Sequence, residues 1–222
     1  MSLTDMFKEF FHKPSLILTY FGMAGVVFTT TSMLTWLPTY FHRVQGLAEG
    51  QAGLKSSAVF LFAIIGAPLG GYLADKWNKT RINARLLLPT ITSLLSAVIL
   101  FFAFTVFDGQ IQYMLLLSVG ISITAFIAAT AAVTQDVVHA GLRAISYAIA
   151  VMVQNLLGAS LGPIVMGAIS DATDIETAFS LLPIALIIAS VLFFTGSFFY
   201  AKDLSKVAKV TLKVEDEEIT LI

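Results

Sequence analysis

The sequence contains no cysteine, which excludes disulfide bonds, thiolate metal sites and cysteine nucleophiles. Charge is also scarce, because only 12% of the 222 residues are Asp, Glu, Lys or Arg, whereas a soluble domain carries about 25%. The net charge of −1 leaves no basic stripe of the kind that binds nucleic acid. We therefore expect neither an ordinary soluble domain nor a nucleic-acid partner.

Apolar residues make up 57% of the chain and gather in six long runs. About 20 apolar residues in a helix cross a hydrocarbon core, and runs of this length without alternation are not barrel strands. The sequence predicts an all-α membrane protein, with a cytoplasmic amphipathic linker segment over 1–14, a six-helix transmembrane domain over 15–201 and a cytoplasmic tail over 202–222. The expected spans are 15–41, 52–74, 86–107, 111–134, 142–169 and 177–201.

Positive charges near the span ends predict the orientation, because Lys and Arg concentrate on the cytoplasmic side. Only Arg43 and Lys55 fall on the side that holds the loop after the first span. Eleven fall on the other side, which places both termini in the cytoplasm. They are Lys8, Lys13, Lys76, Lys79, Arg81, Arg85, Arg143, Lys202, Lys206, Lys209 and Lys213.

The second half of the chain repeats patterns from the first half. Pro89 and Pro183 follow the same Leu-Leu pair in the third and sixth spans and are 94 residues apart. Residues 71–75 (Gly-Tyr-Leu-Ala-Asp) and 167–171 (Gly-Ala-Ile-Ser-Asp) share a pattern at an offset of 96. Three spans followed by a similar three form a 3+3 inverted repeat, which is a transporter-building plan. The alternative is chance similarity between apolar helices.

Two glycine pairs sit in the second and fifth spans, Gly66-Ala-Pro-Leu-Gly70 and Gly158-Ala-Ser-Leu-Gly162. Glycines four residues apart lie on one helix face and allow two backbones to approach closely. We favour close packing over the alternative of bendable gating helices, in which Pro68 and Pro163 loosen their turns.

Residues 70–81 read Gly-Gly-Tyr-Leu-Ala-Asp-Lys-Trp-Asn-Lys-Thr-Arg and fall on the expected loop between the second and third spans. This segment resembles the Gly-x-Leu-Ala-Asp-Arg-x-Gly-Arg-Lys/Arg signature of the major facilitator superfamily of secondary transporters. Asn78 stands where the family usually has glycine and Thr80 interrupts the basic run, so the copy is degenerate, as second halves of such transporters usually show. The resemblance implies one half of the superfamily fold, namely the C-terminal six helices.

The resemblance also implies a cytoplasmic gating motif made of Gly71, Asp75, Lys76, Lys79 and Arg81. Asp75 ends its helix, where the macrodipole disfavours an anion, so it should seek another partner. The family mechanism places this aspartate at the N-terminus of a neighbouring helix, while the basic residues pair across the cytoplasmic mouth. The alternative for the basic residues is the positive-inside bias alone.

Two further stretches are similar to second halves. Residues 6–14 look like the end of the cytoplasmic linker helix that precedes the seventh span of a twelve-span member. Residues 135–143, with 158–171, are similar to the spinster-like and anion-cation symporter branches.

The resemblance implies that the first, second, fourth and fifth helices line a central cavity, whereas the third and sixth face lipid. The candidate cavity-lining residues are Thr31, Thr35, Gln154 and Asn155. A buried amide in hydrocarbon needs a partner, but the hydroxyls of residues 29–32 have the alternative of bonding to the preceding turn. No ionisable side chain lies in the middle of a span, so we expect the ion-coupling groups outside this chain.

The Gly-x-Ser-x-Gly pattern around Ser160 superficially matches the nucleophile elbow of soluble hydrolases. That elbow needs a strand that turns into a helix, and no histidine is placed to activate the serine. We expect no enzyme, no cofactor and no metal site.

A single half leaves its cavity face without a partner. We therefore expect the chain to move a small-molecule substrate across the plasma (inner) membrane together with an N-terminal six-helix half, in contact with the lipid bilayer. The alternatives are a self-associating half that forms a two-fold dimer and a truncated, non-transporting membrane protein. The sequence does not decide the substrate, the coupling ion or the direction.

Overall fold

The computed structural model describes residues 10, 12–207, 210–214 and 217–221, with the side chains of residues 10 and 12–207. Within this part of the chain, six helical segments are long and apolar enough to cross a membrane, which confirms the six predicted spans. The spans, in order, are α2 (Pro14–Arg43), α3 (Glu49–Asn78), α4 (Ala84–Thr105), α5 (Gly109–Thr124) with α6 (Ile127–Asp136), the 3₁₀ turn Ala140–Leu142 with α7 (Arg143–Val153), the π-helix η2 (Gln154–Ser160) and α8 (Leu161–Ala172), and α9 (Ile175–Ser205).

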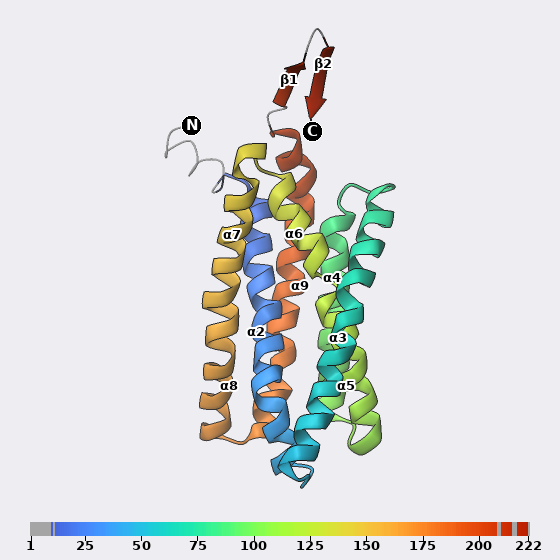
Figure 1. The fold of residues 1–222 in the computed structure, drawn as a ribbon. Coiled ribbons are helices and arrows are strands. Elements are labelled where there is room, and N and C mark those ends of the chain that lie inside the picture. The colour runs from blue at the N-terminus through green and yellow to red at the C-terminus, as the bar shows by residue number, and fades with distance from the viewer. Residues whose placement is uncertain (1–9, 11, 208–209, 215–216, 222) are drawn as a thin grey trace.

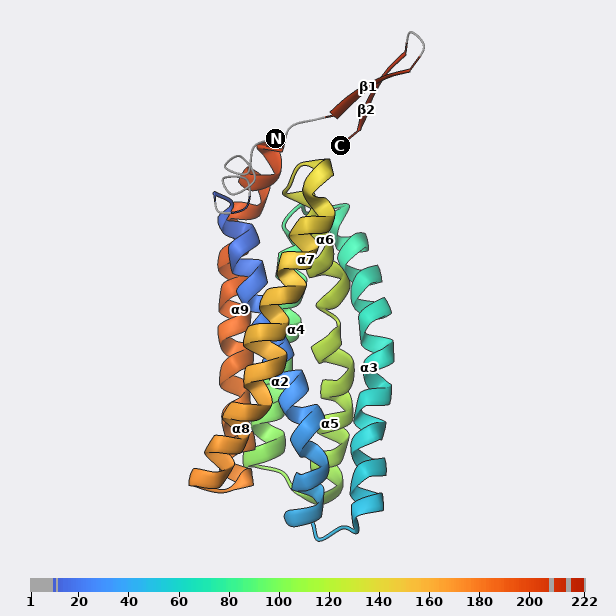
Figure 2. The ribbon, with the colours of Figure 1, turned by 60° about the vertical axis from the view of Figure 1, so that its left-hand side comes forward.

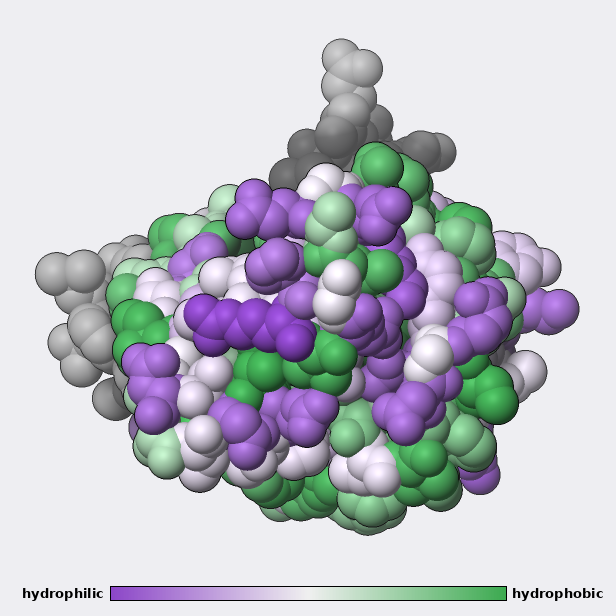
Figure 3. All heavy atoms as spheres, turned by 90° about the horizontal axis from the view of Figure 1, so that it is seen from below, coloured by the Kyte–Doolittle hydropathy of each residue, from purple (hydrophilic) through white to green (hydrophobic). Residues whose placement is uncertain are grey.

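The six spans stand side by side, so α2 begins and α9 ends at the same end of the bundle (Figure 1). We call this the upper end, and the end that holds residues 44–48 the lower end. Viewed from below, the lower end exposes hydrophilic side chains across its middle and hydrophobic ones around its margin (Figure 3). A polar end surface bordered by apolar side chains is what a membrane-spanning helix bundle has where its ends reach water.

The spans pack in a reciprocal pattern. The first span (α2) packs against the fifth (η2, α8) and the sixth (α9), while the fourth (α5) packs against the second (α3) and the third (α4). The third and sixth spans, α4 and α9, pack against each other and lie behind α2 and α3 in Figure 1. Exchanging spans one to three with spans four to six preserves this pattern, as the predicted 3+3 inverted repeat requires.

Glycines bring α3 against the fourth span. A Cβ atom added at Gly66 would lie 2.0 Å from the carbonyl oxygen of Ile121, and one at Gly70 would lie 2.0 Å from that of Ala125. No real Cβ fits at that distance, so the two backbones touch only because both residues are glycine.

The second glycine pair makes the same contact in the other half of the repeat. A Cβ at Gly158 would lie 2.7 Å from the carbonyl oxygen of Ala24, and one at Gly162 would lie 2.5 Å from that of Phe28. The fifth span therefore meets α2 as α3 meets the fourth span, and the predicted close packing is confirmed at both pairs.

The second and fifth spans are the least buried. In the most apolar window of each, 22% of the residues are buried, against 44–56% in the other four spans. The two spans with the glycine pairs thus pack through one narrow face and leave the remainder uncovered by this chain.

The tail holds more structure than expected. Helix α9 continues to Ser205, and two strands follow, β1 (Val210–Val214) and β2 (Glu217–Leu221). They form an antiparallel hairpin with Val210 opposite Leu221, which projects beyond the end of α9 (Figure 2). The candidate site lies within the six helical spans.

Candidate functional site

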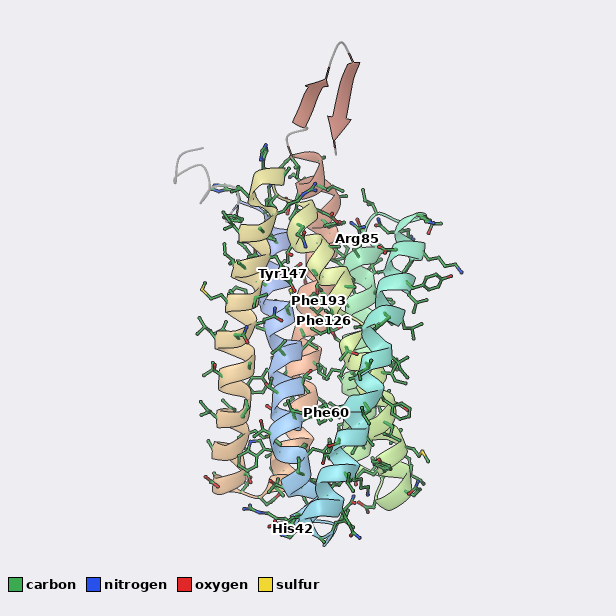
Figure 4. The ribbon with its side chains drawn as sticks, in the orientation of Figure 1. His42, Phe60, Arg85, Phe126, Tyr147 and Phe193 are labelled. Carbon is green, nitrogen blue, oxygen red and sulfur yellow. The ribbon has the colours of Figure 1, made fainter. Side chains whose placement is uncertain are left out.

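A small pocket opens between the first, fourth and fifth spans. Its volume is about 180 Å³, below the roughly 300–1,000 Å³ of a complete small-molecule site. It is lined by Met23, Val27, Thr30, Thr31, Thr124, Phe126, Ile127, Tyr147 and Gln154. Phe126 and Tyr147 lie in the upper half of the bundle, above Phe60 (Figure 4).

The fourth and fifth spans both depart from regular α-helix where they reach this pocket. The fourth span is interrupted between Thr124 and Ile127, at the junction of α5 and α6. The fifth span changes from α-helix to π-helix at Gln154. Irregular turns of this kind recur at functional sites, and transporters place discontinuous helices around their substrates. Neither irregularity is predicted by the sequence patterns described above.

The threonine hydroxyls of the pocket all donate to backbone carbonyls. Thr30 donates to Val26 at 2.9 Å and Thr31 to Val27 at 2.8 Å. Thr124 donates across to α3, to the carbonyl of Ala63 at 2.8 Å. The alternative of local back-bonding for the 29–32 run therefore holds for Thr30 and Thr31 but not for Ser32, whose buried hydroxyl has no partner among the described residues. Each threonine oxygen still retains lone pairs.

The four candidate cavity residues separate into two pairs. Thr31 and Gln154 line the pocket, and within the described part of the chain the side-chain amide of Gln154 makes no hydrogen bond. Thr35 and Asn155 are exposed outside this pocket, and the Asn155 amide donates to the carbonyl of Val151 at 2.8 Å.

The upper end carries a cluster of charged and polar side chains, which we call the upper cluster: Asp75, Arg85, Asp136 and Tyr200. Arg85 forms an ion pair and hydrogen bond with Asp136, and the Tyr200 hydroxyl donates to the same carboxylate at 2.7 Å. Asp75 lies 3.6 Å from the Arg85 guanidinium but is 72% exposed. The cluster joins α3, α4, α6 and α9 at one point, close to the label of Arg85 in Figure 4.

The predicted gating residues contribute unequally to this cluster. Gly71 lies against α6, where an added Cβ would be 3.1 Å from that of Ala128. Lys76, Lys79 and Arg81 are exposed and form no ion pair with the described residues. Asp75 does reach the first turn of the neighbouring helix α4, but through the Arg85 side chain.

Arg85, Asp136 and Tyr200 were missed as site residues. The sequence distinguishes Arg85 only as one of the basic residues near the loop, whose alternative explanation is the positive-inside bias, and Asp136 only as part of the stretch 135–143 that carries a resemblance. A signal was present, because Asp136 is the acidic residue that ends the fourth span at the end where basic residues gather.

An aspartate does meet a helix N-terminus, but it is Asp203 at the end of α9 and not the predicted Asp75. Asp203, only 1% exposed, accepts hydrogen bonds from the Ser15 backbone N–H at 3.0 Å and its hydroxyl at 2.7 Å. Ser15 is in the first turn of α2, where the macrodipole favours an anion. The end of the sixth span is thereby tied to the start of the first.

The lower end is closed by a second polar network. The Gln112 amide donates to the Tyr40 hydroxyl at 2.8 Å and accepts from Gln45 at 2.7 Å. Lys55 donates to Gln45 at 2.6 Å and lies 4.7 Å from the centre of the Phe41 ring. These contacts fasten the loop after α2 to α3 and α5.

The segment 158–162 is helical throughout. The strand-to-helix turn that a serine elbow needs is therefore absent at Ser160.

Comparisons with known proteins place this architecture among transporters. The sequence profile of the Major Facilitator Superfamily matches residues 1–163. Over 68 residues, 31% of this chain and 16% of the relative, the chain is 37% identical to the D-galactonate transporter of Escherichia coli O6:H1 strain CFT073. It is 25% identical over 230 residues, 91% of this chain and 44% of the relative, to protein spinster homolog 1 of Xenopus laevis.

A solved structure shares the fold. The bacterial homologue of the human lysosomal transporter spinster superposes with a TM-score of 0.77 at 20% identity, over 91% of this chain and 51% of that chain. The chain thus spans less than half the length of the curated relatives it matches and about half of the solved neighbour. Both the superfamily and the spinster-like branch expected from the sequence are among these matches.

Proposed function

The chain belongs to the major facilitator superfamily, and from that premise we propose that it supplies the C-terminal six-helix half of an alternating-access secondary transporter for a small solute. Major facilitators hold their substrate between two six-helix halves related by an axis along the membrane normal. The observation that carries the proposal is the low burial of the second and fifth spans. The fifth span contributes Tyr147 and Gln154 to the pocket, and both spans present a face that a second half would cover.

The pocket supports a role as one side of a substrate site. Its volume of about 180 Å³ is too small for a complete site, but closure by a second half would enlarge it. Thr31 and Gln154 are the lining residues that we propose contact the solute. Thr35 and Asn155 lie on uncovered surface and face the second half in this proposal.

The substrate class follows in part from the relatives. One relative carries D-galactonate in its name, so a small hydroxylated organic solute is consistent with the family.

The upper cluster is the proposed gate. We propose that it lies at the cytoplasmic mouth of a transporter in the plasma (inner) membrane, with the orientation that the positive-inside rule favours. Arg85 and Asp136 hold α4 against α6, and Asp75 is free to pair with either Arg85 or a group on the second half. Gly71 keeps α3 close to α6, while Lys76, Lys79 and Arg81 are available to pair across the mouth.

Native mass spectrometry of the tagged protein purified from its source membrane tests the assignment, combined with solute uptake by the same material in liposomes. We expect a particle that contains twelve spans, six of them from a different sequence, and uptake only by that particle. A two-fold dimer of this chain that transports solute would establish the self-associating half instead, and a stable particle without uptake would favour a non-transporting product.

A further inference from the structure

The pocket between the first, fourth and fifth spans offers several hydrogen-bond acceptors. Thr30, Thr31 and Thr124 donate their protons to the carbonyls of Val26, Val27 and Ala63. A hydroxyl whose proton is committed in this way can still accept through its oxygen. These three oxygens therefore select a partner that brings its own O–H or N–H groups.

Two further polar side chains of the pocket form no hydrogen bond with the described residues. Neither the Gln154 amide nor the Tyr147 hydroxyl forms a hydrogen bond with the described residues, although both line the pocket. An amide at membrane depth without a partner is costly, so its retention here points to a ligand or to water that pairs with it. Gln154 can both donate to and accept from a hydroxyl group.

No charged side chain lines the same pocket. Its lining contains no Asp, Glu, Lys, Arg or His, and the ion pair of Arg85 and Asp136 belongs to the upper cluster. Lys55 is engaged by Gln45 and the ring of Phe41 at the lower end. A carboxylate or ammonium group placed here would lose its hydration without gaining a counter-ion.

The remaining lining is apolar and comes from the first and fourth spans: Met23, Val27, Phe126 and Ile127. Side chains of this kind cover the C–H faces of a carbon skeleton while the hydroxyl oxygens and the amide meet its polar edge.

We propose, as an extension of the proposed function, that this pocket recognises the uncharged, hydroxyl-bearing part of the transported solute, and that any charged group of the solute is held by the other half. The ligand chemistry is that of a polyol: several adjacent hydroxyls on a short carbon chain. The pocket discriminates by the hydrogen-bond donors that a ligand brings, and a carboxylate adds nothing to affinity there.

Isothermal titration of the purified chain tests the proposal, in a detergent that has no sugar headgroup. The probes are D-glucitol, D-gluconate and adipate, which share six carbons but carry hydroxyls alone, hydroxyls with one carboxylate, and two carboxylates without hydroxyls. D-glucitol should bind with a Kd of roughly 1 mM, the strength of a few neutral hydrogen bonds, D-gluconate within about threefold of it, and adipate not at all. Absence of D-glucitol binding, or tighter binding of adipate, overturns the proposal.

Variants locate the binding. Thr31→Val and Gln154→Met should each weaken D-glucitol binding about threefold to tenfold, because each removes one neutral hydrogen bond. Thr195→Val is the matched control, since Thr195 makes the same back-bond, to Val191 at 2.8 Å, on the exposed face of α9. Equal weakening by all three variants, or none by the pocket pair, contradicts the assignment. The comparison of probes on the unmodified chain stands even if a variant does not fold.

The outcomes separate this inference from the proposed function. Uptake by a twelve-span particle with no D-glucitol binding to the pocket overturns the inference alone. D-glucitol binding with transport by a two-fold dimer of this chain overturns the two-half assignment alone.

Discussion

At the residue scale, the glycines of α3 differ in what surrounds them. An added Cβ at Gly70 would lie 2.0 Å from the carbonyl oxygen of Ala125, whereas one at Gly53 meets nothing within 4 Å. Gly70→Ala should therefore destabilise the chain by about 1–3 kcal/mol through overpacking. Gly53→Ala should stabilise it by up to about 1 kcal/mol through helix propensity. Thermal unfolding in detergent measures both signs, and stabilisation by Gly70→Ala would contradict the packing.

The contacts of the upper cluster predict the order in which four substitutions lower the free energy of unfolding. Arg85→Met and Asp136→Asn each leave a partly buried partner unpaired, which should cost about 1–3 kcal/mol after allowance for solvent screening. Tyr200→Phe removes one hydrogen bond and should cost about 1 kcal/mol. Asp75→Asn should cost less than about 1 kcal/mol, because Asp75 is 72% exposed. Denaturant titration of the four variants gives the order, and a larger loss for Asp75→Asn than for Asp136→Asn would contradict it.

Asp174 caps α9 at its N-terminus and predicts a pH dependence. Its carboxylate accepts from the Thr177 backbone N–H at 2.6 Å, and this hydrogen bond is the main cause that lowers the pKa of Asp174 below its ordinary value. A lowered pKa in the folded state means that the stabilisation is complete above the ordinary Asp pKa and is lost as pH falls through the lowered one.

Asp174→Asn provides the comparison, since asparagine also caps a helix but does not titrate. The melting temperature of the unmodified chain minus that of the variant should be positive at pH 7 and shrink below about pH 4, near the ordinary Asp pKa. A difference that stays constant from pH 7 to pH 3 would show that the charge of Asp174 does not stabilise α9.

At the scale of elements, the first and sixth spans are tied by a carboxylate at a helix start. Asp203→Ala should remove both hydrogen bonds from Ser15 and leave its backbone N–H without that acceptor, so we expect a loss of about 1–3 kcal/mol. Ser15→Ala removes only the hydroxyl and should cost less, about 1 kcal/mol. Asp171→Asn, on an exposed residue at the lower end, is the matched control with no expected change. Hydrogen exchange at the start of α2 should accelerate in Asp203→Ala alone.

The sequence predicts some elements of this fold and not others, because only some of them leave a pattern in the order of the residues. Six apolar runs and uneven positive charge predict the spans directly, because membrane insertion depends on composition and length. The glycine pairs predicted close packing because their spacing matches one helix face. The break after Thr124 and the π-helix at Gln154 leave no comparable periodic signal, since both depend on neighbours that the chain meets only after folding.

Only part of the candidate site was predicted from the sequence, because only some of its residues stand out in the sequence pattern. Gln154 and Thr31 were found because polar side chains in apolar runs are conspicuous. The upper cluster was missed, although the motif around Asp75 pointed to that end. The motif identified the loop correctly, but the partner of Arg85 lies on the fourth span, and only the three-dimensional packing brings Asp136 and Tyr200 to it.

At the scale of the whole molecule, the fold matches one half of the superfamily fold. Spans four, five and six repeat the contacts of spans one, two and three, so the domain is internally complete as a repeat. The second and fifth spans nevertheless remain largely uncovered, and the fifth span also lines the pocket. This surface is what the proposed second half would bury.

Lipid accessibility of single cysteines tests the proposal of a covered face most directly, and the cysteine-free sequence makes the labelling clean. Spin labels would be scanned over exposed positions of the second and fifth spans, Leu61, Leu69 and Ile164, and over Ile91 and Phe198 on α4 and α9. In the protein assembled in its source membrane, we expect positions on the second and fifth spans to be protected from a lipid-soluble relaxation agent, while those on α4 and α9 stay accessible. Equal accessibility of all these positions would contradict a covered face and with it the assignment as one half of a transporter.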